Sequence, residues 1–472
     1  MTPRTPPVFT FDQLQAWSGG TWDIPSPGSR PPHVRGVTQD TRNLAPGALY
    51  CALRGAQYDG HDYVSQAAAS GAAAALVAGD WPRPDGLGLP LLRVPDPLRG
   101  LQDLARGWRM ECRETFFVGI TGSAGKTTTR SLVQALLAGI GPTGGTPGNL
   151  NNHVGLPLSL LAMPAGMRFG VFEIGMNHPG ELKPLCDILR PSAGIITNIG
   201  PVHLEFFESV QAIADEKAEL LRALPADGFA VLDFASPHYE FIRSQLSCEC
   251  VSVCLNPAKV AGAEPAKITV MGASRPPNII KVRGVPDTVM SPLPGRHGSL
   301  NLLLAAALAH RLGLAWGDMN EALKAFQLPE MRGQSLHTRG RWVVNDAYNA
   351  NPLSMRCTLD AFAQQVSTWP GRRVVVLGDM RELGPAAEEL HREVGKHLAT
   401  NGINPALLVT VGRAADWIAG GYHDAGGNAE ILRYADSTTA AREVMDWTRE
   451  GDAILLKGSR GVALERVVEA FG

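Results

Sequence analysis

Long apolar runs, cysteines and aromatic side chains are all scarce in this chain of 472 residues. The longest apolar stretches fall well short of the roughly 20 residues that a membrane-spanning helix needs, so we expect no membrane span. Residues 1–10 contain no basic segment followed by an apolar one, which predicts that the chain has no secretory signal peptide. These absences together favour a cytoplasmic protein.

The seven cysteines are too few to indicate a disulfide framework in a chain of this length. Cys248, Cys250 and Cys254 lie close together, but their C-x-C-x3-C spacing lacks a nearby histidine and a second C-x-x-C pair. We therefore expect reduced thiols there, and a zinc site is the less favoured alternative.

The chain also lacks a surplus of basic charge, because 43 basic and 45 acidic residues give a net charge of -2. A nucleic-acid groove needs a concentration of positive charge, and base stacking needs aromatic side chains, which make up only 6% here. We therefore expect no nucleic-acid partner.

What the chain has is length, with 52 glycines and 35 prolines spread along it. At roughly 150 residues per domain, the length predicts about three domains. Changes in the pattern of apolar residues divide them at residues 1–112, 113–328 and 329–472. The abundant glycine and proline agree with short loops between many secondary-structure elements.

Apolar strands alternate with loops and amphipathic helices from Thr115 onward, which predicts an α/β fold with a mostly parallel sheet. A second alternation begins near Pro329 and predicts a doubly wound, Rossmann-like C-terminal domain. Between them, Cys248–Pro294 is β-rich and broken by prolines, so we expect an antiparallel addition. Separate helices are expected over Val64–Ala75, Leu98–Cys112 and 438–449.

The strongest local signal is a glycine-containing loop between an apolar strand and a helix. It reads Gly122-Ser123-Ala124-Gly125-Lys126-Thr127, and Thr128 follows. Its backbone N–H groups and the helix N-terminus can bind phosphate oxygens, Lys126 can reach the β- and γ-phosphates, and Thr127 can ligate Mg²⁺. Because position 120 is Ile120 and not glycine, the loop fits a shorter G-x-x-G-K-T form. The alternative is an ordinary turn between a strand and a helix.

Two further residues follow predicted parallel strands and could bind a metal ion. Glu173 ends the strand that begins at Phe169, and His203 follows the strand Ile195–Ile199. The carboxyl ends of parallel strands face the ligand crevice, where Mg²⁺ finds oxygen ligands. The alternatives are a solvated glutamate and a structural histidine.

Lys217 lies on the apolar stripe of a predicted helix, at the position between Ile213 and Leu220 where an apolar residue is expected. It is either a lysine that extends its charge to solvent or a partly buried lysine whose neutral amine is reactive. The pattern alone leaves both interpretations open.

Taken together, these motifs resemble the Mur ligases of peptidoglycan synthesis over nearly the whole chain. The resembling strings are Val37–Arg42, Ile120–Thr128, Gly148–Asn152, Glu173–Glu181, His203–Glu205, Pro294–His297, Asn345–Pro352, Leu377–Met380 and Lys457–Arg460. Asn-Leu-Asn-Asn and Tyr-Asn-Ala-Asn-Pro are most similar to the members that add D-alanyl-D-alanine. The Asp-Asn-Pro-Arg string of the members that add diaminopimelate is absent.

The resemblance implies a domain for the UDP end of a precursor, a central P-loop-type ATPase and a C-terminal Rossmann-like domain. It implies that Lys126 and Thr127 hold ATP and one Mg²⁺, and that Glu173 and His203 hold a second Mg²⁺. Lys217 matches the family lysine that CO₂ carbamylates, and the carbamate would add an oxygen ligand for metal.

The resemblance also implies binding roles for further residues. Asn301 matches a residue beside the adenine, and Arg332 and Asp346 match contacts to the phosphates and ribose, although Met331-Arg332-Gly333-Gln334 departs from the usual Pro-Gly-Arg. The remaining expected substrate-binding residues are Asp40, Thr41, Arg42, Asn149, Asn152, Asn177, His178, Tyr348, Asn349 and Asn351.

The activity that the resemblance implies is ATP-dependent joining of D-alanyl-D-alanine to UDP-N-acetylmuramoyl-tripeptide through an acyl phosphate, by a monomer. His178 and His203 are candidates for the base that deprotonates the amine. The alternatives are a sibling that adds a single diamino acid, a folate polyglutamate-type ligase, and a P-loop NTPase that makes no covalent product.

Overall fold

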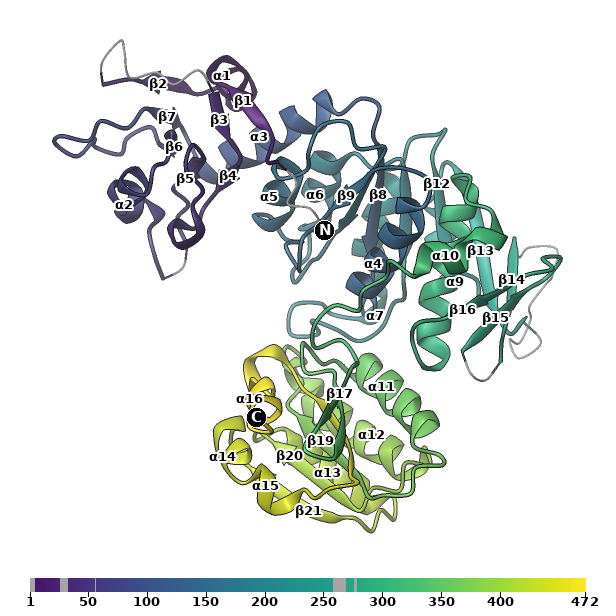
Figure 1. Cartoon of the computed structure of the whole chain (residues 1–472). Helices are drawn as coiled ribbons and strands as arrows, with labels where there is room; N and C mark the ends of the chain where they lie inside the picture. Colours follow the sequence, from purple (N-terminus) through teal and green to yellow (C-terminus); the bar gives the residue numbers. More distant parts are fainter. Residues whose placement is uncertain (1–4, 26–32, 56, 258–268, 276–277) are drawn as a thin grey trace.

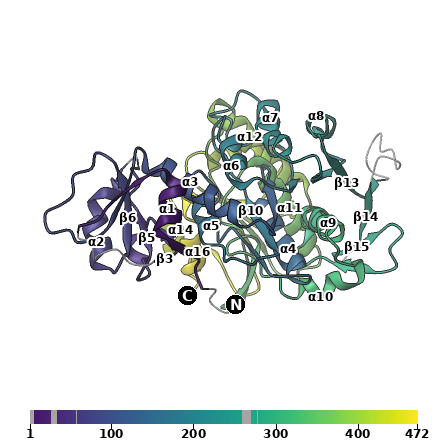
Figure 2. The ribbon, with the colours of Figure 1, turned by 90° about the horizontal axis from the view of Figure 1, so that it is seen from above.

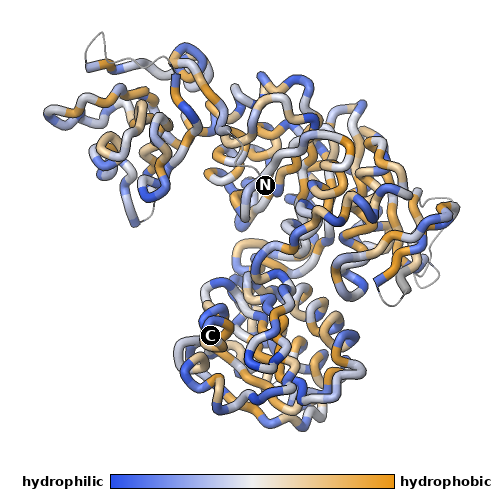
Figure 3. Tube along the Cα trace, viewed as in Figure 1, coloured by the Kyte–Doolittle hydropathy of each residue, from blue (hydrophilic) through white to orange (hydrophobic). Residues whose placement is uncertain are grey.

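A computed structural model describes residues 5–25, 33–55, 57–257, 269–275 and 278–472. Three bodies follow one another along the chain, and the first and last are each attached to the middle one (Figures 1 and 2). Hydrophobic residues concentrate along the strands inside each body (Figure 3). Among the residues described, no helix combines the length and the apolar character required to cross a bilayer.

The N-terminal body contains a five-stranded sheet in the order β2-β7-β6-β5-β4 and a small β1-β3 pair. Its elements are β1 (Val8–Thr10), α1 (Phe11–Ser18), β2 (Thr21–Asp23), β3 (His33–Arg35), β4 (Val37–Thr38), β5 (Leu49–Cys51), α2 (Val64–Ala69), β6 (Ala74–Ala78), β7 (Leu91–Val94) and α3 (Pro97–Glu111). The helix predicted over Val64–Ala75 therefore ends early. Gly71, at φ 88°, follows α2 and turns the chain toward β6, which pairs between β5 and β7.

The middle body contains a nine-stranded sheet in the order β16-β15-β14-β13-β12-β11-β8-β10-β9. Its strands are β8 (Phe116–Thr121), β9 (Thr143–Gly145), β10 (Phe169–Glu173), β11 (Ala193–Ile196), β12 (Phe229–Asp233), β13 (Glu249–Leu255), β14 (Val270–Arg275), β15 (Ile279–Val282) and β16 (Thr288–Met290). Its helices are α4 (Lys126–Ala138), α5 (Gly155–Leu161), α6 (Leu182–Leu189), α7 (Val210–Arg222), α8 (Tyr239–Ser244), α9 (Gly295–Arg311) and α10 (Met319–Leu323).

The segment predicted as an antiparallel addition is only partly antiparallel. Strands β13 and β14 continue the parallel sheet, and only the β14-β15-β16 edge is antiparallel. A parallel β13-β14 pair requires a crossover between the two strands, and part of that connection, residues 258–268, lies outside the described residues.

The C-terminal body contains a six-stranded sheet in the order β17-β18-β22-β19-β20-β21, parallel except for the β17-β18 hairpin. Its strands are β17 (Gln334–Thr338), β18 (Arg341–Asn345), β19 (Arg373–Gly378), β20 (Leu407–Val411), β21 (Glu430–Tyr434) and β22 (Ala453–Lys457). Its helices are α11 (Pro352–Gln365), α12 (Ala387–Thr400), α13 (Ala415–Asp424), α14 (Ser437–Arg442), α15 (Val444–Trp447) and α16 (Glu465–Glu469). The single helix predicted over 438–449 is thus two helices that meet at Glu443.

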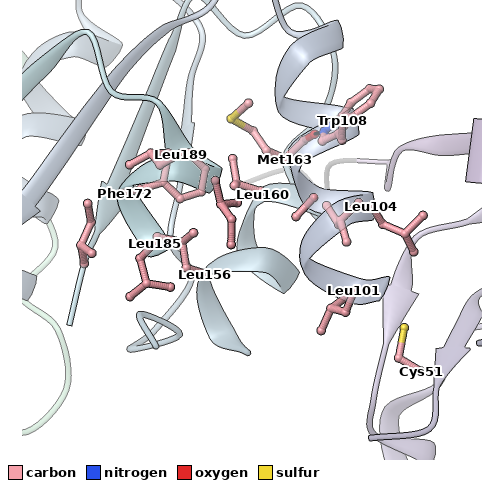
Figure 4. Packing of buried hydrophobic residues seen from close by; sticks show 14 of the residues in the cluster. Cys51, Leu101, Leu104, Trp108, Leu156, Leu160, Met163, Phe172, Leu185 and Leu189 are labelled. Atoms are coloured by element: carbon pink, nitrogen blue, oxygen red, sulfur yellow. Dashed lines mark hydrogen bonds between the residues drawn. The ribbon is translucent and has the colours of Figure 1, made fainter. Parts of the chain in front are cut away.

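One hydrophobic core crosses from the N-terminal body into the middle one. Helix α3 presents Leu101 and Leu104 toward the N-terminal strands, and its Trp108 donates its indole N–H to the carbonyl of Met163, 3.1 Å away in the middle body (Figure 4). The buried clusters of the C-terminal body contain only residues from beyond position 335. The first two bodies therefore share a core, and the third has its own.

Candidate functional site

A cleft of about 680 Å³ lies between the middle and C-terminal bodies. The middle body contributes the loop between β8 and α4 and the segments that follow β10 and β11. The C-terminal body contributes the segments that follow β18 and β22. All of these follow the carboxyl ends of parallel strands, where open α/β sheets bind their ligands.

The predicted phosphate loop forms one wall of the cleft, and the residues after β11 hold it in place. Asn198 accepts hydrogen bonds from the backbone N–H groups of Ser123, through its carbonyl at 3.0 Å, and Ala124, through Oδ1 at 2.8 Å. Gly125 has φ 78°, a conformation that favours glycine, and it begins helix α4. No described side chain caps α4, so its first-turn N–H groups suit an anionic ligand.

Two cations converge on this helix N-terminus. Lys126 folds back over the loop, and its Nζ donates to the carbonyl of Gly122 at 2.7 Å. Arg332 comes from the far side of the cleft, and its Nη2 lies 3.3 Å from the Thr127 hydroxyl. Desolvation lowers the pKa of Lys126; the Glu173 carboxylate opposes this shift and Arg332 adds to it. The concentration of positive charge fits the phosphates of ATP.

The buried carboxylate of Glu173 lies beside the loop at the end of β10. The Thr127 hydroxyl donates to its Oε2 at 2.8 Å, and Asn151 Nδ2 donates to its Oε1 at 2.7 Å. A hydroxyl and a carboxylate next to a phosphate site are ligands that Mg²⁺ accepts, with water and phosphate oxygens completing its shell. Within the described part of the chain, no three His, Cys, Asp or Glu side chains gather closely enough to hold a metal ion by themselves.

His203 contacts the C-terminal body. Its Nδ1 lies 2.5 Å from Oε2 of Glu382, and the Glu205 N–H donates to the carbonyl of Glu382 at 3.3 Å. The hydrogen bond to His203 lowers the pKa of Glu382. His203 also has φ 55°, which is uncommon outside glycine and concentrates at functional sites. The contact leaves Nε2 of the ring as the nitrogen available to a ligand.

Lys217 is buried on α7, with 2% of its surface exposed, and does not line the cleft. Burial lowers its pKa well below that of a free lysine, the nearby Lys126 lowers it further, and Glu216 opposes both. Burial thus disfavours the charged ammonium and favours the neutral amine.

The opposite wall is organised around Asp346. Its Oδ2 accepts from Nζ of the buried Lys457 at 2.7 Å and from the Thr358 hydroxyl at 2.6 Å. Lys457 also donates to the carbonyl of Asn349 at 3.0 Å, which ties the segment after β18 to the end of β22. These bonds fix the Asp346 carboxylate at the edge of the cleft.

Other predicted residues stabilise the walls as well as line them. Asn351 caps α11, and its Nδ2 donates across the cleft to the Ser123 carbonyl at 3.3 Å. Asn152 accepts the Gly155 N–H at 2.8 Å at the start of α5. The guanidinium of Arg332 lies over the Tyr348 ring, 3.9 Å from its centre. His178 lies 4.2 Å from the Phe206 ring.

The structure brings most of the predicted residues into this one cleft. They are Ser123, Ala124, Gly125, Lys126, Thr127, Thr128, Asn149, Asn152, Glu173, Asn177, His178, His203, Asn301, Arg332, Asp346, Tyr348, Asn349 and Asn351. The predicted residues that do not line it are Gly122, Lys217, Asp40, Thr41 and Arg42. Asp40 and Arg42 lie in the N-terminal body and pair with each other at 2.7 Å.

Several lining residues were not assigned roles from the sequence. Asn151, Lys457 and Arg460 stand inside strings that carry the family resemblance, so those strings were the available signal. Glu382 lies 179 positions from His203, and no local pattern predicts their contact. All seven cysteines are free, and burial raises the pKa of the one in the cleft, Cys357, to about 12.

Comparisons with known proteins agree with this geometry. A family model described as the Mur ligase middle domain matches residues 120–309. The models for the Mur ligase glutamate ligase domain and the Mur ligase family catalytic domain match residues 331–460 and 33–109.

Similar proteins match the chain over nearly its whole length. UDP-N-acetylmuramoyl-tripeptide–D-alanyl-D-alanine ligase of Bacillus subtilis is 32% identical over 92% of this chain and 93% of its own length. A crystal structure of MurF from Acinetobacter baumannii superposes with a TM-score of 0.83 at 27% identity and covers 99% of both chains. The MurF ligase of Thermotoga maritima, solved in complex with ADP, has a TM-score of 0.76 at 25% identity over 93% of this chain and 97% of its own. The chain belongs to the Mur ligase family.

Proposed function

We propose that this chain is the ligase that joins D-alanyl-D-alanine to UDP-N-acetylmuramoyl-tripeptide at the expense of ATP, in peptidoglycan precursor synthesis. The observation that carries the proposal is the cleft, in which an uncapped phosphate loop faces the Asp346 wall of a second body. The full-length relatives named above, including one solved with ADP, support it.

The first chemical step forms an acyl phosphate. An oxygen of the tripeptide carboxylate attacks the γ-phosphorus of ATP, the bond to the bridging oxygen breaks, and ADP leaves. Lys126 and Arg332 neutralise the charge on the phosphoryl oxygens. The turn at Gly125 lets these oxygens reach the backbone N–H groups at the start of α4. Asn301, whose amide lies 2.9 Å from where a Cβ on Gly125 would stand, borders the adenine side, and Asp346 binds the ribose.

Magnesium, when bound, would supply charge neutralisation at the transferring phosphoryl group. Thr127 and Glu173 would hold one ion, and Glu173, His203 and a carbamylated Lys217 would hold another. Two observations support this assignment. The neutral amine favoured at Lys217 is the form that reacts with CO₂. Glu382 bonds Nδ1 of His203, as carboxylates do for histidines that bind metal through the other nitrogen.

The second step forms the amide. The dipeptide amine attacks the acyl carbon, the carbon–oxygen bond breaks, phosphate leaves, and the amine loses its proton. Both candidate bases line the cleft with Nδ1 bonded by a glutamate, Glu181 for His178 and Glu382 for His203. Because His203 is assigned to the metal, we propose that His178 accepts the proton of the amine.

The rest of the precursor extends beyond the cleft. We assign its UDP end to the N-terminal body, with Asp40, Thr41 and Arg42 as the binding residues, because the Arg42 side chain is exposed and cationic. This division gives residues 1–112 the UDP end, residues 113–328 the nucleotide and residues 329–472 the ribose and the dipeptide.

Phosphate release measured with each substrate omitted in turn tests the proposal. Release should require ATP, UDP-N-acetylmuramoyl-tripeptide and D-alanyl-D-alanine together, and Lys126→Ala should abolish it. Lys183→Ala, an exposed lysine on α6, is the matched control and should keep full activity. Phosphate release without the dipeptide, or support by diaminopimelate in its place, would contradict the proposal.

A further inference from the structure

Four lysine and arginine side chains line the cleft among the residues described: Lys126, Arg332, Lys457 and Arg460. Lys126 and Arg332 meet at the phosphate loop, and Lys457 is buried against the Asp346 carboxylate. Arg460 is different, because 56% of its side chain is exposed and its ion pair is with Glu465 on α16, not with a residue of the phosphate loop. Arg460 is therefore the one of these four side chains that has no assigned role in binding ATP.

The backbone that carries Arg460 is held firmly. Ser459 donates its N–H to the carbonyl of Asp379 at 3.0 Å, and its hydroxyl accepts the N–H of Arg381 at 3.0 Å. The guanidinium of Arg381 then donates to the carbonyl of Gly461 at 3.0 Å. The turn after β22 is thus cross-linked to the turn after β19 on both sides of Arg460, which reduces the entropy cost of binding a ligand there.

The guanidinium itself is oriented from one side only. Its Nη1 lies 3.0 Å from Oε1 of Glu465 on α16 and 3.5 Å from the Met331 sulfur. Burial raises the pKa of Tyr348, and the charge of Arg460, after that of Arg332, opposes this shift, so the charge of Arg460 reaches a side chain that lines the cleft. The protein thus contacts one edge of the planar guanidinium, and its remaining N–H donors can bind a second carboxylate.

The incoming dipeptide brings such a carboxylate. Its amine must be neutral to attack, so its terminal carboxylate is then its only charge, and an extended dipeptide separates the two groups by roughly 7 Å. We propose that Arg460 binds the terminal carboxylate of D-alanyl-D-alanine, with Glu465 as the residue that orients it. This proposal rests on the proposed function and names a specificity residue within it.

The test compares two acceptors on the full-length enzyme: D-alanyl-D-alanine and its C-terminal amide. In the wild type, replacing the carboxylate by the amide should reduce kcat/KM on the order of 10- to 100-fold, the usual effect of losing a hydrogen bond between charged groups. Arg460→Gln should show the same loss with the dipeptide and should no longer discriminate between dipeptide and amide. KM for ATP should change by less than about twofold, because the nucleotide contacts remain.

Controls separate binding from folding. Arg442→Gln, an exposed arginine on α14 of the same body, should retain the wild-type preference for the carboxylate. Arg460→Lys keeps the charge but loses the planar guanidinium, so its preference for the dipeptide over the amide should lie between those of the wild type and Arg460→Gln. This variant keeps the proposal testable if Arg460→Gln fails to fold.

Two results would overturn the proposal. One is an Arg460→Gln enzyme that still prefers the dipeptide over its amide. The other is a rise in KM for the muramoyl tripeptide instead of the dipeptide, which would assign Arg460 to a carboxylate of the precursor. Wild-type enzyme that ignores the dipeptide altogether would contradict the proposed function, and that outcome is distinct from both.

Discussion

Single residues here combine chemical roles with structural ones, and Lys217 is the clearest case. A hydrophobic helix stripe predicted an apolar residue at its position, and the side chain is buried there. Its neutral amine is stabilised by the same burial that would make an ammonium costly.

Replacing Lys217 by Ala should therefore remove an oxygen ligand and lower turnover by more than roughly 100-fold, the upper range for losing a supporting metal contact. Millimolar acetate or formate should restore part of the activity, because a small carboxylate can enter the space vacated. A ¹³C NMR carbamate signal from labelled bicarbonate should be present in the wild type and absent in the variant. Full activity of Lys217→Ala would contradict the carbamate assignment, and Lys183→Ala serves as the exposed control.

His391 gives the C-terminal body a dependence on pH. It is fully buried, its Nε2 accepts the Met380 N–H at 2.9 Å, and its Nδ1 bonds the Ala387 carbonyl at 2.6 Å. Only the neutral ring can accept from Met380. Desolvation lowers the pKa of His391 below that of the exposed imidazole, while the bond to Ala387 opposes the shift.

Because the unfolded chain binds this proton more readily, the contribution of His391 to stability is complete above about pH 6.5 and declines as the pH falls, by at most about 1.4 kcal/mol per unit. Hydrogen exchange at the Met380 amide, corrected for the intrinsic rate, should lose protection between pH 7.5 and 5.5. His391→Gln keeps an acceptor that does not titrate and should remove this dependence. Equal pH dependence in both proteins would rule out His391 as the cause.

At the scale of elements, the phosphate loop depends on the conformation of one glycine. Gly125 has φ 78°, and a Cβ there would stand 2.9 Å from the Asn301 amide nitrogen. Alanine should cost about 1–2 kcal/mol in backbone strain and also displace Asn301. Gly125→Ala should therefore weaken ATP binding, measured by titration calorimetry, by roughly tenfold.

Gly166→Ala is the matched control, because it has a similar φ of 76° but open space around the added methyl group. It should lose comparable stability without losing affinity for ATP. Equal losses of ATP affinity in the two variants would show that strain alone, and not the position of Gly125, governs binding.

The elements that the sequence predicted well are those with local signals. Apolar runs bounded by glycine or polar residues predicted β8 and β10 to within a residue or two, and the resemblance to the Mur ligases over the whole chain predicted the three-body α/β fold. The predictions that failed depended on distant contacts. The helix over 438–449 is interrupted at Glu443, whose carboxylate accepts the hydroxyl of Tyr434 on β21. The parallel pairing of β13 with β14 depends on a crossover that no local pattern encodes.

In the candidate site, too, residues with a local sequence signal were predictable and residues that depend on distant contacts were not. Residues at strand ends, such as Glu173, were predictable because strand ends are visible in the sequence. Lys457 is also the last residue of a strand, but its role depends on a carboxylate 111 positions earlier, which only the fold brings within 2.7 Å. Arg332 departs from the family string and nevertheless reaches the phosphate loop, with its guanidinium stacked on the Tyr348 ring of the same body.

At the scale of the molecule, the three bodies are not three independent units. Helix α3 joins the first two bodies through one buried cluster, whereas the buried clusters of the third body are separate. Calorimetry of the full chain should therefore show two unfolding transitions and not three.

Leu104→Ala should lower the free energy of unfolding of the unit formed by the first two bodies by about 2–5 kcal/mol, as buried leucine truncations do. The transition of the C-terminal body should stay in place. Leu398→Ala, in the core of the third body, should do the reverse. Three separate transitions, or equal shifts of both transitions by Leu104→Ala, would show that the shared core does not couple the first two bodies as described.

The shared core also sets how many independent movements the enzyme has. If residues 1–328 move as one rigid piece, any rearrangement that brings the two walls of the cleft together is a single displacement of the C-terminal piece about the residues near Gly333 (φ 78°). One pair of fluorescent labels, with one label on each piece, then reports the whole trajectory. A precursor bound at its UDP end would stay on residues 1–328. Only the C-terminal residues that contact the nucleotide and the dipeptide would then have to move toward it.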